Sequence, residues 1–328
     1  MSEEAETAPP AGATAVGRSR AATIARWVIP FLVSGSLLAW ILSGMDVGRV
    51  FERVTLEVAM VFVPALLGFV VVALFIEAVC LVLVVSQSVA FSSLLLAARI
   101  KAASYLLSII NYALGAGALA VLLRRRAGMP LAEAAGSVFV IGLFDLGSLL
   151  AFVVVGLALM GTDTPGVQAG VVALAGAAIV AGFAFLRAPV SMGPLDRLRE
   201  LKIFRAARTL PIALLIRLGL LRGFFVGGFI VLAWATLAAF DVSVPMLPLI
   251  VNTCVMLLVA ALPIAAAGLG TGQLVFVALF ERWAPAETLL AASLLLSFGM
   301  IVTRSTLGLL FAREFASEAI AHREDVDA

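Results

Sequence analysis

Charged residues are scarce in this sequence, and their scarcity excludes a water-soluble fold. Only 13% of the 328 residues are charged and 63% are hydrophobic, with a mean hydropathy of +1.17. A soluble domain has about 25% charged residues and about half apolar ones. Several stretches continue for 20 or more residues with almost no charge, which is the length that crosses roughly 30 Å of hydrocarbon. The sequence therefore predicts an all-α polytopic membrane protein.

Histidine and cysteine are also nearly absent, which limits the chemistry that the chain can perform. The single histidine, His322, lies in the polar C-terminal region, and this excludes imidazole catalysis and histidine-bound metal within the membrane. Cys80 and Cys254 stand alone in apolar runs, without the spacing of metal ligands. The G-x-x-x-x-G-K-[ST] motif of ATP-binding proteins is missing. We therefore expect no enzymatic activity, no metal and no cofactor.

Eight hydrophobic segments are present between two polar tails. The tails, 1–20 and 313–328, are predicted to be cytoplasmic, the first of them disordered because it has no apolar periodicity. Residues 188–210 are rich in arginine and are predicted to form a basic amphipathic loop at a headgroup surface. The hydrophobic segments are 27–43, 59–83, 102–123, 131–159, 165–187, 211–240, 243–281 and 286–312.

The distribution of positive charge decides the topology. With eight full spans, the cations divide poorly between the two sides of the membrane, against the positive-inside rule. The division improves if 102–123 is a re-entrant hairpin from the cytoplasm and the break at 263–272 forms a second hairpin facing outside. Three cations then fall outside and three within the membrane, so 16 of the 22 Lys and Arg residues are cytoplasmic. Alternatively, 102–123 is an ordinary span whose glycines allow close helix packing.

This topology contains an inverted repeat. Residues 27–159 become span, span, hairpin and span, and residues 160–312 repeat that order in the opposite orientation. The chain would have six full spans, two re-entrant hairpins and both termini in the cytoplasm. Interrupted segments at matching positions of two inverted halves are typical of a transporter's binding site.

The two interrupted segments offer polar groups inside the membrane. Irregular backbone is tolerated at this depth where it lines a polar cavity, and exposed N–H groups at helix N-termini attract anions. Both breaks are therefore predicted to line the substrate path. The residues of the first break are Asn111, Tyr112, Gly115 and Gly117, and those of the second are Pro263, Gly268, Gly270, Gly272 and Gln273.

Five ionisable residues lie within the predicted spans: Glu77, Asp145, Arg217, Arg222 and Arg304. Each costs at least about 2.5–3.5 kcal/mol at the bilayer centre, so it usually has a partner or a task. Pairing each acid with an arginine leaves one guanidinium, whose planar donors suit a phosphate or a carboxylate. We expect the arginines to bind a lipid headgroup, Arg222 first, and the acids to balance charge or relay protons. Alternatively, Arg217 snorkels to the membrane surface, or all five residues are structural ion pairs.

Two stretches resemble the lysylphosphatidylglycerol synthase transmembrane-region family, whose members are flippase-like. They are LPIAAAGLGTGQLVFVALF, which starts at residue 262, and AETLLAASLLLSFGMIVTRSTLGLLFA, which starts at residue 286. Pro263 and the Gly268–Leu269–Gly270 run match the family's second signature, with Gln273 where an acidic residue is usual. Asn111, Gly117 and the arginines that follow are similar to the first signature. The resemblance implies lipid translocation in the cytoplasmic membrane of a bacterium or archaeon, without the separate synthase domain.

The sequence thus predicts a flippase-like transporter of an anionic lipid or lipid-linked headgroup. Its expected partners are anionic membrane lipids and not nucleic acid. We expect the protein in the cytoplasmic membrane. The excess of Arg over Lys favours a bacterial source. The alternative is a membrane scaffold, or an accessory subunit for a lipid- or glycan-modifying enzyme at the cytoplasmic face.

Overall fold

The computed structural model describes four long stretches of the chain, with Gly48 and scattered positions between 166 and 181: 52–110, 112–160, 208–261 and 270–327. Beyond Ala312 only the backbone is described. The predictions for the tail 1–20, for the first hydrophobic segment and for almost all of the loop 188–210 lie outside these residues. The predicted site residues Asn111, Pro263 and Gly268 lie outside them too.

Four long helices form the frame of the molecule. Each contains a stretch that is long and apolar enough to cross a membrane, and in the last helix that stretch is Ala286–Ala312. This confirms the prediction of a multi-pass helical membrane protein. The helices are α3 (Leu56–Val85), α6 (Leu131–Leu159), α10 (Ile212–Ala239) and α13 (Ala286–Asp327).

Four shorter helices lie between the long ones. They have 10 to 16 residues, so at about 1.5 Å per residue each is about 15–24 Å long, less than the hydrocarbon thickness. Strands are absent from the described parts of the chain. The short helices are α4 (Leu94–Ser108), α5 (Tyr112–Ala127), α11 (Met246–Ala260) and α12 (Thr271–Phe280).

Local sequence explains where the helices begin. Hydroxyl side chains cap α3 and α4: Thr55 Oγ1 accepts from the Val58 N–H at 3.3 Å, and Ser93 Oγ accepts from the Leu96 N–H at 3.2 Å. Four other helices start directly after a proline, whose fixed φ suits the start of a helix, where no N–H donor is needed. These prolines directly precede α6, α10, α11 and α13: Pro130, Pro211, Pro245 and Pro285.

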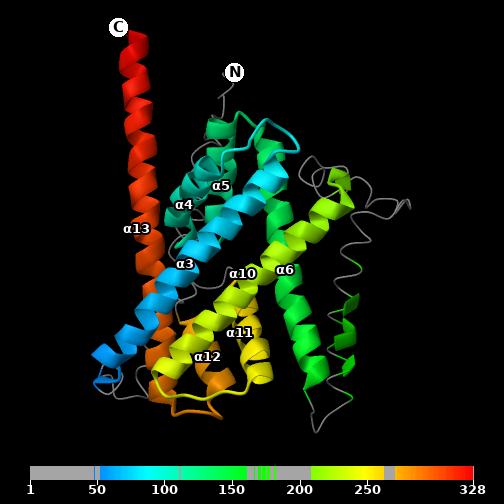
Figure 1. Cartoon of the computed structure of the whole chain (residues 1–328), viewed down its shortest axis with the longest axis vertical. Coiled ribbons are helices and arrows are strands. Elements are labelled where there is room, and N and C mark those ends of the chain that lie inside the picture. The colour runs from blue at the N-terminus through cyan, green and yellow to red at the C-terminus, as the bar shows by residue number, and fades with distance from the viewer. Residues whose placement is uncertain are drawn as a thin grey trace, which may run out of the picture.

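The helices fall into two groups with the same order of lengths. A long helix, two short helices and a long helix run from α3 to α6, and the same order runs from α10 to α13. Figure 1 shows that α10 packs along α3 but runs in the opposite direction, and that α13 likewise runs opposite to α6. The short pair α4–α5 lies near one end of the molecule and the pair α11–α12 near the other. Corresponding helices of the two groups are therefore oppositely directed.

The first interrupted segment differs in detail from the prediction. Two helices, α4 and α5, cover 102–123 in place of one continuous helix, and they pack against each other. The turn at residues 109–110 precedes the glycine-rich run, so Gly115 and Gly117 lie within α5. A Cβ at position 115 would overlap the backbone and Cβ of Ser108. This glycine therefore allows close approach of the two helices and does not interrupt α5.

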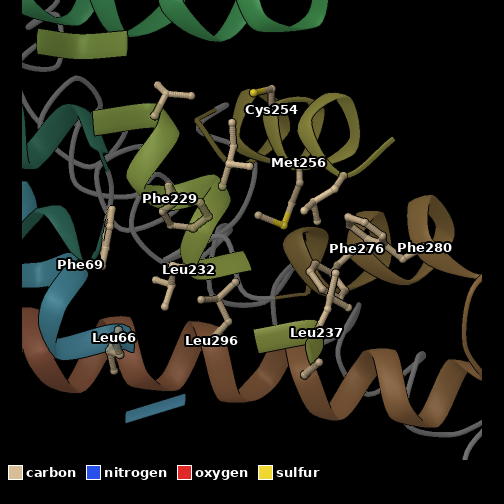
Figure 2. Close-up of a cluster of buried hydrophobic side chains, with 14 of the residues drawn as sticks. Leu66, Phe69, Phe229, Leu232, Leu237, Cys254, Met256, Phe276, Phe280 and Leu296 are labelled. Atoms are coloured by element: carbon tan, nitrogen blue, oxygen red, sulfur yellow. The ribbon is translucent and has the colours of Figure 1, made fainter. Parts of the chain in front are cut away.

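A large cluster of buried hydrophobic side chains, named here the apolar cluster, joins α3, α10, α11, α12 and α13 (Figure 2). The rings of Phe69 and Phe229 meet edge to face with centroids 5.5 Å apart. Gly299 of α13 allows α3 to come close, because a Cβ there would lie 2.8 Å from Leu66. Lipid tails are as apolar as these side chains, so close packing is what holds the helices together here. Members labelled in Figure 2 include Leu66, Leu232, Leu237, Met256, Phe276, Phe280 and Leu296.

Candidate functional site

A buried carboxylate of α3 is held by two donors from α4. The Lys101 Nζ lies 3.0 Å from Oε1 of Glu77, and the Tyr105 hydroxyl donates a hydrogen bond to Oε2 of the same carboxylate. Glu77 is only 8% exposed, whereas Lys101 is 22% exposed. Burying a carboxylate is costly unless it is paired and hydrogen-bonded, and both requirements are met here.

A second ion pair joins the two helix groups. Arg222 of α10 donates from Nε and Nη2 to Oδ1 of Asp145 on α6. The arginine is 2% exposed and the aspartate 23%. The guanidinium carbon of Arg222 lies 4.3 Å from the ring centroid of Phe225, one turn further along α10. The Arg222 guanidinium is thus held by the carboxylate of Asp145 on α6 and by the aromatic ring of Phe225 on its own helix, α10.

Arg304 of α13 brings a third cation to the same place. Its guanidinium carbon lies 5.4 Å from the ring centroid of Tyr105, the tyrosine that donates to Glu77. Among the residues that the structure describes, no acidic side chain forms an ion pair with Arg304. We call the five ionised residues the charged cluster; it has three cations (Lys101, Arg222 and Arg304) and two carboxylates (Glu77 and Asp145).

A cavity opens beside this charged cluster. Four of the five ionised residues line it, all except Arg304. About 50 Å³ of it is accessible to a molecule the size of water, and the empty space including the open solvent at its mouth is about 510 Å³. Helices α3, α4, α5 and α6 supply every lining residue except Arg222 of α10. The cavity therefore lies within the first helix group, and α10 of the second group closes one side of it. The neutral polar residues of the wall are Ser104, Ser108 and Tyr112.

The predicted residues of the first break divide between the cavity and the outside of the helix pair. Tyr112 and Gly115 line the cavity. Gly117 is exposed on α5, and a Cβ there would meet no atom within 4 Å. The glycine-rich run therefore presents one face to the cavity and another to the surroundings, as a regular helix does.

The described residues of the second break are Gly270, Gly272 and Gln273, and they do not line the cavity. Gly270 precedes α12 with a φ of +85°, which favours glycine. The Gly270 N–H donates to Oε1 of Gln273 at 2.6 Å, and Nε2 of Gln273 donates to Oγ of Ser297 at 3.0 Å. Gln273 is fully buried, and Gly272 lies beside it in the first turn of α12. Gln273 thus caps the N-terminus of α12 and connects this helix to α13 by a hydrogen bond.

Arg217 stands apart from the other arginines. It is exposed on α10 and does not line the cavity. The neighbouring Ile216 and Leu220 are exposed as well, so this part of α10 faces the surroundings of the protein. A long cationic side chain in such a position can extend toward the polar membrane surface.

Two members of the site are missing from the sequence prediction, namely Lys101 and Tyr105. The sequence predicts Lys101 to lie in a cytoplasmic loop, because the hydrophobic segment begins at residue 102. A signal for both was present. Residues 101, 104, 105 and 108 are Lys, Ser, Tyr and Ser, and the spacing i, i+3, i+4, i+7 places them on one face of a helix. A polar face on a helix within an apolar region indicates a polar cavity.

Comparison with known proteins gives one match. Residues 27–308 match the family described as the lysylphosphatidylglycerol synthase TM region. The matched region begins before α3 and ends within α13, so it contains every residue of the charged cluster. No curated protein and no solved structure matches the chain.

Proposed function

We propose, since the chain belongs to the lysylphosphatidylglycerol synthase transmembrane-region family, that it is a flippase-like transporter of lipids with an anionic headgroup. The headgroup binds in the cavity of the first helix group, which Arg222 of the second group closes, and is carried across the bilayer. The role is one of binding and movement, without a chemical reaction. The observation that carries this proposal is the unbalanced cation of the charged cluster, Arg304.

Electrostatics supports an anionic ligand. Charges within spanning helices are costly and usually mark a functional site. The pairs Glu77–Lys101 and Asp145–Arg222 are neutral overall, so they explain their own burial. Arg304 is explained by neither pair. Its planar guanidinium matches the geometry of a phosphate. Arg304 lies over the Tyr105 ring and outside the cavity wall, so it turns from that ring to reach a ligand, whereas the guanidinium of Arg222 already lines the cavity. In the proposed site, Arg304 and Arg222 hold the phosphate while the two acids balance charge.

The arrangement of the helices supports movement between two sides. Corresponding helices run in opposite directions (Figure 1), which is the arrangement expected of an inverted-topology repeat with a site between its halves. The helices α4–α5 and α11–α12 would be the two re-entrant hairpins. The end of α5 carries Arg124, Arg125 and Arg126, which by the positive-inside rule faces the cytoplasm. Without an ATP-binding motif, movement is passive or driven by an ion gradient.

A transport assay tests the proposal. The protein is reconstituted into phosphatidylcholine vesicles that contain fluorescent phosphatidylglycerol, and transfer between leaflets is followed by quenching from outside. We expect Arg304→Ala to slow transfer by at least tenfold relative to wild type. Arg282→Ala is the matched control, because Arg282 is exposed near the end of α12, away from the cavity. Equal rates for the wild type and a stably folded Arg304→Ala protein would argue against the proposed site.

A second candidate is the non-transporting scaffold, with a partner enzyme at the cytoplasmic face. It is favoured by the fact that both ion pairs join neighbouring helices, Glu77 to α4 and Asp145 to α10, so their role can be structural. The double variant Asp145→Leu/Arg222→Met separates the two functions. A scaffold retains its assembly and shows no lipid transfer before or after the change, whereas a transporter folds and loses most of its transfer rate.

A further inference from the structure

The pairing of Lys101 differs from that of Arg222. Arg222 is almost fully buried and donates twice to Asp145. Lys101 is more exposed and lines the cavity; it has one ionic contact, to Glu77 at 3.0 Å, and its Nζ lies 5.7 Å from the ring centroid of Tyr105. A lysine ammonium is a point charge on a flexible four-carbon stem, so it can exchange one anionic partner for another. Of the two paired cations, Lys101 is therefore the one that can leave its acid when a ligand binds.

We propose that Glu77 competes with the anionic ligand for Lys101 and that protonation of Glu77 releases the lysine, so that one anion binds together with one proton. The inference rests on the proposed function and adds its regulation. In the empty cavity, Glu77 holds Lys101 against the wall. In the occupied cavity, Lys101 joins Arg304 and Arg222 at the phosphate, and the Glu77 carboxylate has taken up a proton from the solvent. One O–H bond forms on Glu77 and one bond to that proton breaks in the hydronium ion or buffer acid that donates it; no other covalent bond changes.

The charged and titratable groups around Glu77 leave this exchange to Lys101. Helix α4 presents Lys101 and Tyr105, which both contact the carboxylate. Arg222 of α10 and Asp145 of α6 are held by each other, and Arg304 of α13 lies over the Tyr105 ring. Only the α4 contacts are therefore direct partners that a ligand can replace.

The loss of Lys101 makes protonation favourable. Without the ammonium, the buried carboxylate of Glu77 would keep a single neutral donor, the Tyr105 hydroxyl. An ionised group that has lost its buried partner is strongly disfavoured, and it neutralises instead. A protonated Glu77 keeps its contact with Tyr105, because the phenol oxygen can accept a hydrogen bond from the new carboxyl O–H.

Net charge favours the anion, whereas the proton follows from the loss of Lys101 as the partner of Glu77. The empty charged cluster has three cations and two carboxylates, so it has one excess positive charge. A singly charged phosphodiester balances that charge when it binds. The proton is then taken up because a buried carboxylate that has lost its cation is strongly disfavoured.

The test measures binding and proton uptake together. Wild-type protein in phosphatidylcholine nanodiscs is titrated with short-chain phosphatidylglycerol at acidic and at alkaline pH, by calorimetry in buffers of different ionisation enthalpy. We expect tighter binding at acidic pH and uptake of about one proton per lipid bound. Glu77→Gln should bind about tenfold more tightly than wild type at alkaline pH and lose the pH dependence. Glu57→Gln, an exposed acid on the same helix, should behave as wild type.

The outcomes separate this inference from the proposed function. If wild type binds the lipid but takes up no proton, and Glu77→Gln binds with the wild-type affinity, the competition is wrong while the lipid site stands. If neither protein binds phosphatidylglycerol at any pH, the proposed function and the inference both fall. The proton count is measured on the wild type alone, so the inference stays testable even if Glu77→Gln does not fold.

Discussion

The two short helix pairs occupy corresponding places in their helix groups, but their surroundings differ. The pair α4–α5 borders a cavity with ionised residues, and Lys101, Ser104 and Tyr112 of the pair face it. The pair α11–α12 lies against the apolar cluster (Figure 2). Two of its polar side chains form hydrogen bonds within the pair or to α13: Asn252 Nδ2 donates to the Leu279 carbonyl at 2.7 Å, and Gln273 Nε2 donates to Ser297.

This difference shows that a repeated backbone order can carry unequal chemistry. The helix lengths alternate in the same way in both groups, yet the acids of the charged cluster come from α3 and α6 and its arginines from α10 and α13. The site is therefore made by the contact between the groups and not by either one alone. Packing at the α11–α12 end supplies stability, and the α4–α5 end supplies the polar cavity.

The largest expected effect comes from breaking the ion pair between the groups. Asp145→Leu leaves Arg222 buried without an acid, which destabilises a protein by about 3–5 kcal/mol. Adding Arg222→Met should recover most of the loss, because an apolar pair of similar volume replaces the ions. Thermal and chemical unfolding in detergent measure both. If the single and double variants are equally unstable, the destabilisation comes from lost packing and not from the stranded charge.

The next effect concerns the close approach of α4 and α5. Gly115→Val places side-chain atoms where Ser108 already lies, and overpacking of this kind costs about 3 kcal/mol. The helix pair must separate, so we expect a lower unfolding temperature together with weaker lipid binding in the adjoining cavity. A Gly115→Val protein with wild-type stability would contradict the close packing of this pair.

A smaller effect is expected at the corresponding pair. Gln273→Ala removes the acceptor of the Gly270 N–H and the donor to Ser297, and an unsatisfied buried group costs about 1–2 kcal/mol. Because Gln273 does not line the cavity, stability should fall while the dissociation constant for phosphatidylglycerol stays unchanged. A clear loss of affinity would mean that the second pair takes part in headgroup binding.

The smallest effect serves as the control for Gly115. Gly117→Ala adds a methyl group that meets no atom within 4 Å, and alanine is favoured over glycine within a helix by about 1 kcal/mol. We expect an unchanged or slightly raised unfolding temperature. Marked destabilisation would show that α5 is distorted at this position and is not a regular helix.

The sequence predicts the long helices well because uninterrupted apolar runs have few other solutions in a membrane. Segments 59–83, 131–159 and 211–240 correspond closely to α3, α6 and α10. The interruption within 102–123 is less predictable. Glycine both breaks helices and permits their close packing, so composition alone does not separate the two roles. Here Gly115 permits the close packing of α4 and α5, and the turn between these helices includes residues 109–110.

The site is predicted in part. Glu77, Asp145, Arg222 and Arg304 stand out because each is an ionisable residue in an apolar run, and the structure brings all four together. Lys101 is not predicted because it lies at the margin of its hydrophobic segment, where a cation is ordinary. Its partner is equally unpredictable: pairing depends on how α3 and α4 pack, and nothing in the sequence matches acids to cations.

The last helix has one more consequence. α13 continues without interruption for 42 residues, to Asp327, well past the stretch that suits a membrane (Figure 1). The same continuous helix therefore contains Arg304 and extends to Asp327. At about 1.5 Å per residue the arm beyond Arg304 is about 35 Å long, so a tilt of about 10° displaces its tip by about 6 Å. A small tilt of α13 near the cavity would therefore produce a larger displacement at the far end of the helix.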